Sequence, residues 1–397
     1  MQLNALELKQ LIKMFVANNE HLMSKGQNPI ALNIEGEAGG GKTSVVRQVA
    51  KELGMELVFL NPGELSETAD LVGFPFKEFE FCNNNTSKCE WVPDNLIHSM
   101  VELGYTYTGN YRQSYAVPRW IKDAKPNSIL LVDDFSRGSS EIQQALMRII
   151  LEQGFVSWKL PENCHVILTS NPDNGSNTSY NIESLDWAQS TRFLTIEYKT
   201  EAKIWAAWAE GNEVPSYAIN FVLHMPEVLE DEKFKMNSRI LTLFFHSLVS
   251  VDPKQQIWYL KALGERATSN DFIAAFTSFI IENDELMSLL TPEQILNNNT
   301  KSVFEFVQKY RGNQAILGML IFRLENYIRH RVSKGTFTDN EAKQFIEIIV
   351  ESYEKDKMFT KDMISAIVLN TWSIDNRLKT LATKLPQMFR NIMIGDI

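Results

Sequence analysis

The chain has few of the features of a secreted, metal-bound or membrane-spanning protein. Its three cysteines, Cys82, Cys89 and Cys164, are an odd number and lack the C-x-x-C spacing of a zinc site. This pattern favours free thiols in a reducing compartment over a disulfide framework or a metal centre. No apolar run approaches the ~18 to 20 residues of a membrane-spanning helix, so we expect a soluble chain without a membrane span.

An excess of positive charge is also missing. The formal net charge of −10 argues against broad binding to nucleic acid or anionic membranes, although a local basic groove stays open. Residues 1–25 place Leu8, Leu11, Ile12 and Phe15 on one face of an amphipathic helix with acids among them. That pattern is not a signal peptide, and we expect a cytoplasmic protein.

What the sequence does contain is a glycine-rich loop. Gly36, Gly41, Lys42 and Thr43 have the spacing G-x-x-x-x-G-K-[ST] of a phosphate-binding loop. Apolar residues alternate before the loop as in a strand and recur at helical spacing after it. Because both flanking elements are predicted, we interpret the loop as a nucleotide site rather than as a chance glycine-rich turn.

The chemistry of the loop fits a polyphosphate. Glycines let backbone N–H groups turn inward, and the helix N-terminus adds a positive end. Lys42 would reach the β- and γ-phosphates, and Thr43 would offer its hydroxyl to Mg²⁺. We expect ATP or GTP with Mg²⁺. The predicted nucleotide-binding residues are Gly36, Glu37, Ala38, Gly39, Gly40, Gly41, Lys42, Thr43 and Ser44.

Two further apolar runs end in polar residues. Residues 128–132 read as a buried parallel strand followed by Asp133 and Asp134, where open α/β sheets bind ligands. We expect Asp133 to hold Mg²⁺ and Asp134 to polarise the attacking water, the alternative being acids that cap a turn. Residues 165–170 form a second such strand before Asn171, whose amide could bond the γ-phosphate or the water, or could belong to an ordinary turn.

A long aromatic segment, residues 74–118, separates the loop from these strands. It is too long for a connector in a compact domain, so it predicts an insertion with structure of its own. Its aromatic residues are interpreted first as core and second as a surface for a polypeptide partner.

Taken together, these motifs resemble those of the AAA+ ATPases, and within them the MoxR branch. Residues 36–43 resemble Walker A, 129–134 Walker B, 169–172 sensor 1, 185–193 the arginine-finger segment and 238–239 sensor 2. The resemblance implies an α/β core, an AAA+ P-loop NTPase fold with parallel strand order 5-1-4-3-2 and flanking helices, then an all-α lid and a further all-α C-terminal region.

The resemblance also assigns two arginines. Arg192 would complete the nucleotide site of a neighbouring subunit, a role worth ~10³ to 10⁵ in rate, and Arg239 would be sensor 2. Their alternatives are a salt bridge near the last strand and a helix-face pair. The family's catalytic carboxylate is usually Glu, whereas Asp134 is a methylene shorter, so slow turnover is expected.

The expected organisation has four parts: an N-terminal helical segment (1–27), the α/β nucleotide-binding domain (28–200), a helical lid (201–265) and a helical C-terminal domain (266–397). The insertion lies at about 74–118 within the second.

The resemblance implies a ring homo-oligomer, expected to be a hexamer, that hydrolyses Mg-ATP to remodel a protein client or a partner with a von Willebrand factor A domain. One alternative is a slow-hydrolysing, ATP-gated ring scaffold. Another is a DNA-associated AAA+ machine, such as a clamp loader or initiator, against which stand the acidic charge and the lack of a recognisable DNA-binding module.

Overall fold

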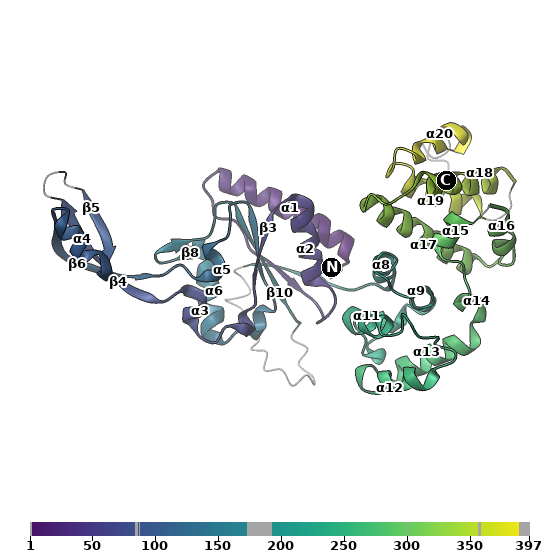
Figure 1. Ribbon diagram of the computed structural model, residues 1–397, viewed down its shortest axis with the longest axis horizontal. Coiled ribbons are helices and arrows are strands. Elements are labelled where there is room, and N and C mark those ends of the chain that lie inside the picture. The colour runs from purple at the N-terminus through teal and green to yellow at the C-terminus, as the bar shows by residue number, and fades with distance from the viewer. Residues whose placement is uncertain are drawn as a thin grey trace. The chain divides into compact units, whose positions relative to one another are not determined.

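The computed structural model describes residues 2–83, 86, 88–172, 193–298, 300–355 and 359–388 (Figure 1). The chain divides into two compact units, residues 1–199 and 200–397. The first unit contains the strands, and the described part of the second is helical.

The first unit is built on a six-stranded, wholly parallel sheet with the order β1-β11-β2-β10-β7-β3. Without the short β1, this is the predicted order 5-1-4-3-2, which is therefore confirmed. β1 is an edge strand that the sequence pattern did not indicate. The strands are β1 (Gln2–Leu3), β2 (Leu32–Glu35), β3 (Glu56–Leu60), β7 (Ser128–Val132), β10 (Cys164–Ser170) and β11 (Leu194–Tyr198).

Helices cover both faces of this sheet (Figure 1). Alternate residues of β7 separate into two cores: Ile129 and Leu131 pack with α1 and α2, whereas Leu130 and Val132 pack with α3, α5 and α6. Every residue of β7 and β10 is buried, as expected for strands covered on both sides. The helices are α1 (Ala5–Ser24), α2 (Lys42–Leu53), α3 (Thr68–Val72), α5 (Arg119–Lys122) and α6 (Ser140–Glu152).

The insertion forms a separate antiparallel sheet of order β5-β4-β6, with β4 (Pro75–Asn83), β5 (Cys89–Pro93), β6 (Tyr105–Tyr115) and helix α4 (Ile97–Glu102). It has a small core of Phe81, Val92 and Met100. Tyr107 and Tyr111 are 43% and 65% exposed. The aromatic residues of the insertion are therefore partly core and partly surface. A small hairpin, β8 (Gly154–Phe155) and β9 (Trp158–Lys159), follows α6.

The expectation of three free thiols is wrong for two of them. Cys82 and Cys89 are opposite each other on β4 and β5, with Cα atoms 4.0 Å apart, and form a disulfide. Cys164 is free and buried. The spacing of the cysteines alone did not reveal the hairpin that brings the first two together.

In the second unit, one hydrophobic cluster extends from Ala202 to Met388. None of the described helices is long and apolar enough to cross a bilayer. The division at residue 265 remains a prediction. The helices are α8 (Ala202–Ala209), α9 (Ser216–His224), α10 (Glu227–Glu230), α11 (Ser238–His246), α12 (Ile257–Ala267), α13 (Asn270–Glu282), α14 (Asp284–Met287), α15 (Pro292–Asn297), α16 (Thr300–Gln308), α17 (Gln314–Ser333), α18 (Asp339–Lys355), α19 (Lys361–Thr371) and α20 (Leu381–Lys384).

A buried ion pair lies inside the second unit. The guanidinium of Arg323 pairs with the carboxylate of Glu210, and both side chains are almost fully buried. Arg323 Nη1 also donates to Ser216 Oγ at 2.8 Å and to Asn220 Oδ1 at 2.7 Å. Burial raises the pKa of Glu210, and the Arg323 charge opposes this shift.

Candidate nucleotide-binding site

The glycine-rich loop lies between the end of β2 and the start of α2, as the motif requires. Gly39 and Gly41 have φ values of +77° and +100°, a left-handed conformation that favours glycine. Gly36 is constrained by space instead, because a Cβ there would lie 2.5 Å from the carbonyl oxygen of Tyr198. The loop is thus held in a shape that side chains at these positions would disturb.

Lys42 and Asn171 come together at this loop. Lys42 is 5% exposed. Its Nζ donates to the carbonyl oxygens of Gly36 at 2.5 Å and Glu37 at 2.9 Å, and to Asn171 Oδ1 at 3.2 Å. The ammonium therefore lies among acceptors from the loop and from the residue that follows β10.

The two predicted metal ligands are also neighbours. Thr43 Oγ1 donates to Asp133 Oδ1 at 2.6 Å. This pairing of a hydroxyl with a carboxylate suits a hard cation such as Mg²⁺, which uses few protein ligands together with water and phosphate oxygens. Among the residues that the structure describes, no group of three His, Cys, Asp or Glu could hold a metal by itself. The phosphates of a nucleotide would supply the missing ligands.

Thr169 bonds to both Asp133 and Asp134. This contact was not predicted from the sequence. The Thr169 hydroxyl donates to Asp133 Oδ1 at 2.8 Å and accepts from the backbone N–H of Asp134 at 2.9 Å. Thr169 is fully buried near the end of β10. Its place in the motif 169–172 was the only signal in the sequence, and nothing there distinguished its hydroxyl from that of Ser170.

Asp134 has a different environment from Asp133. Its backbone has a φ of +54°, and its Oδ2 forms an ion pair with Arg137 Nε at 3.2 Å. Arg137 lies three residues further along the chain, in the short 3-10 helix η3 (Phe135–Arg137). One acid therefore contacts the loop threonine while the other is paired with an arginine of its own turn.

The remaining predicted residues are less closely associated. Glu37, Ala38 and Ser44 are exposed. Arg192 lies outside the described residues, with the rest of the segment 173–192. Arg239 is exposed in the first turn of α11, in the second unit. The roles of both arginines remain predictions.

Tyr198 is a second residue that the sequence did not single out. It is the last residue of β11, 7% exposed, and its hydroxyl donates to the carbonyl oxygen of Gly40 at 2.8 Å. A tyrosine that ends a strand pattern gives no indication of a partner in the glycine-rich loop.

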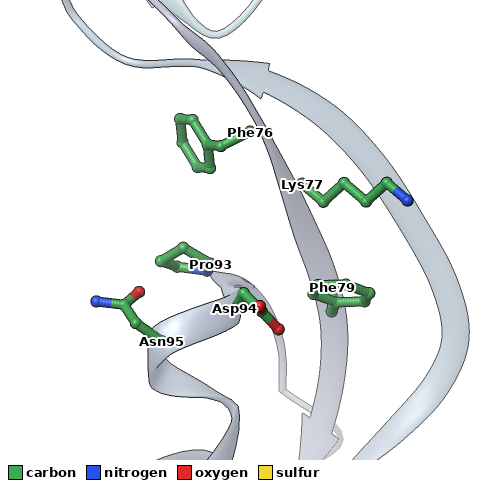
Figure 2. A pocket seen from close by; sticks show the side chains of 6 residues that line it. All are labelled: Phe76, Lys77, Phe79, Pro93, Asp94 and Asn95. Atoms are coloured by element: carbon green, nitrogen blue, oxygen red, sulfur yellow. The ribbon is translucent and has the colours of Figure 1, made fainter.

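A cavity of about 650 Å³ lies on the insertion rather than at the phosphate loop (Figure 2). Phe76, Lys77 and Phe79 line it from β4, and Pro93, Asp94 and Asn95 line it from the end of β5 and the turn after it. Its mixture of aromatic rings with one cation and one acid differs from the polar phosphate loop. The cavity is thus a separate feature of the insertion.

Comparison with known proteins gives limited matches. No family model matches the chain. The gas vesicle ATPase GvpN of Ancylobacter aquaticus is 27% identical over 150 residues, which is 36% of this chain and 38% of that protein. The match thus spans well under half of the relative's length.

Solved structures of RuvB from Thermotoga maritima are also similar. One point mutant of RuvB is 13% identical, with 77% of this chain and 78% of that chain covered and a TM-score of 0.35. A second point mutant is 10% identical, with 83% and 90% covered and a TM-score of 0.34. At TM-scores this low, the similarity assigns neither a fold nor a function to this chain. What the structure itself shows is a parallel α/β unit in which the glycine-rich loop, Lys42 and the residues after β7 and β10 lie together.

Proposed function

We propose that this chain is a MoxR-like AAA+ ATPase that binds and hydrolyses Mg-ATP at the boundaries between subunits of a ring. The observation that carries the proposal is the meeting of Lys42, Thr43, Asp133 and Asn171. They come from α2 and from the residues that follow β7 and β10. Parallel neighbouring strands end at the same sheet edge, where α/β folds bind ligands.

Each of these residues has a distinct task in that reaction. The Lys42 ammonium exchanges its carbonyl partners for β- and γ-phosphate oxygens, while the loop amides bond the remaining oxygens. Thr43 and Asp133 would hold Mg²⁺, which neutralises phosphate charge when bound. Asp134 and Asn171 orient the attacking water.

The ring and its partner complete the proposal. Arg192 of one subunit would reach the nucleotide of the next, so single chains would hydrolyse ATP slowly. The partner is a client protein or a protein with a von Willebrand factor A domain, in the cytoplasm. The exposed Tyr107 and Tyr111 of the insertion support a protein-binding role for this part of the chain.

The first test compares two lysines of the same helix. Lys42→Ala should abolish ATP binding measured by calorimetry, whereas Lys51→Ala, at an exposed position in the last turn of α2, should bind as the wild type does. Equal affinity of Lys42→Ala and wild type would refute the assignment of the site.

The second test concerns assembly. ATPase activity per chain should rise with protein concentration, in step with the ring detected by analytical ultracentrifugation. A concentration-independent specific activity would refute a site shared between subunits.

A slow ATP-gated scaffold is the alternative that an observation favours. Asp134 is shorter than the usual glutamate, and its Oδ2 is paired with Arg137 Nε at 3.2 Å, so the attacking water would compete with this arginine for the carboxylate. Turnover of Asp134→Glu separates the two: a large gain in rate favours the scaffold, and an unchanged or lower rate favours the remodelling ATPase.

A further inference from the structure

Tyr198 contacts the phosphate loop at more than one glycine. Its hydroxyl donates to the Gly40 carbonyl at 2.8 Å, and a Cβ at Gly41 would lie 3.7 Å from that same hydroxyl. A Cβ at Gly36 would lie 2.5 Å from the Tyr198 carbonyl oxygen. The beginning and the end of the loop are therefore both packed against this residue.

Tyr198 is itself held firmly in place. Its ring belongs to the core formed by α1, α2 and one face of the sheet. Its backbone pairs with Leu3 of β1, and the N–H of the next residue, Lys199, donates to the Leu3 carbonyl at 2.9 Å. The hydroxyl that contacts Gly40 is thus supported by a rigid strand rather than by a loop.

Fixing the Gly40 carbonyl also fixes an amide. The carbonyl of Gly40 and the N–H of Gly41 belong to one planar trans peptide and point in opposite directions. Because the carbonyl is directed at the Tyr198 hydroxyl, the Gly41 N–H is directed away from the tyrosine. The Gly40 N–H donates to the Glu37 carbonyl at 3.3 Å and the Gly41 carbonyl accepts from the Val45 N–H at 3.0 Å, so the Tyr198 bond adds a direct constraint on the peptide between them.

We propose that Tyr198 is a positioning residue of the phosphate-binding loop, whose hydroxyl orients the Gly40–Gly41 peptide so that its N–H is available to a nucleotide polyphosphate. This inference rests on the proposed function. A loop already held in its binding shape loses less entropy when it binds, so the hydroxyl favours affinity without touching the ligand.

The test removes the hydroxyl and nothing else. Tyr198→Phe keeps the buried ring, and Tyr217→Phe is the matched control, because the Tyr217 hydroxyl also donates to a backbone carbonyl, that of Leu248 at 3.2 Å in the second unit. The measurements are the Kd for a fluorescent ATP analogue and the KM for ATP, with urea denaturation to record stability.

Losing one net hydrogen bond predicts an affinity about 2- to 13-fold weaker for Tyr198→Phe, with KM rising by the same factor. Tyr217→Phe should change stability alone. If Tyr198→Phe binds the analogue as tightly as a wild type that does bind it, the inference is overturned and the proposed function stands. If the wild type does not bind the analogue, the proposed function fails, and the inference with it.

Discussion

Replacing Thr169 by valine tests the two hydrogen bonds through which its hydroxyl contacts Asp133 and Asp134. Valine keeps the shape of the side chain but removes the hydroxyl that donates to Asp133 and accepts from the Asp134 N–H. Thr169 is fully buried, so a water molecule cannot simply take the place of the hydroxyl. Asp133 keeps its bond from Thr43, whereas the Asp134 N–H loses the threonine oxygen.

The expected cost has two parts. Leaving the Asp134 N–H without the threonine oxygen should lower the free energy of unfolding by about 1–3 kcal/mol, measured by urea denaturation. Thr169→Val also loses the charge-assisted bond to Asp133, so the carboxylate is no longer held in place. The Mg²⁺ concentration needed for half-maximal ATP binding should therefore rise by about tenfold. The second effect is measured by titrating Mg²⁺ at fixed ATP.

Thr371→Val is the control for this experiment. Thr371 is also fully buried, and its hydroxyl donates at 2.6 Å to the carbonyl of Ile367 in its own helix. The control should lose stability without any change in Mg²⁺ dependence. If Thr169→Val and Thr371→Val behave alike in the Mg²⁺ titration, Thr169 does not orient Asp133.

Three further measurements follow from other contacts. Burial lowers the pKa of His165, so near pH 6.5 the unfolded chain takes up a proton that the folded chain does not. The free energy of unfolding should therefore fall as the pH drops from about 7.5 to 5.5. His165→Leu should lose this part of the pH dependence in urea denaturation, and equal pH slopes for the variant and the wild type would contradict the explanation. Arg323→Met should lower the free energy of unfolding by about 3–5 kcal/mol in urea denaturation, because it leaves Glu210 buried without its cation. Adding Glu210→Leu should restore most of that stability, and a double variant as unstable as Arg323→Met would contradict the explanation. Thiol titration in denaturant should find one thiol before reduction and three after it, because Cys82 and Cys89 are paired, whereas three before reduction would exclude the disulfide.

The local parts of the site could be predicted from the sequence. Gly36, Lys42 and Thr43 are close in the chain, so their spacing can be read directly, and the left-handed backbone at Gly39 and Gly41 is one that glycine favours. The strand order came from the resemblance to a family rather than from the strand patterns, which indicate a buried strand without indicating its neighbours.

Other long-range contacts could not be predicted. Tyr198 and Gly40 are 158 residues apart, and their contact depends on β11 lying beside β2 in one register. The bond from Thr169 to Asp133 likewise depends on the pairing of β10 with β7. The Cys82–Cys89 disulfide depends on a hairpin register that no residue type specifies.

The short strand β1 has a practical consequence for anyone who shortens this chain at its amino end. Gln2 and Leu3 shield the outer side of β11, and α1 then covers an apolar face of the sheet. Removing Gln2 and Leu3 would leave backbone N–H and C=O groups of β11 unpaired at the sheet edge, where another chain could pair with them and cause aggregation. We expect such a truncated protein to aggregate more readily than the full chain.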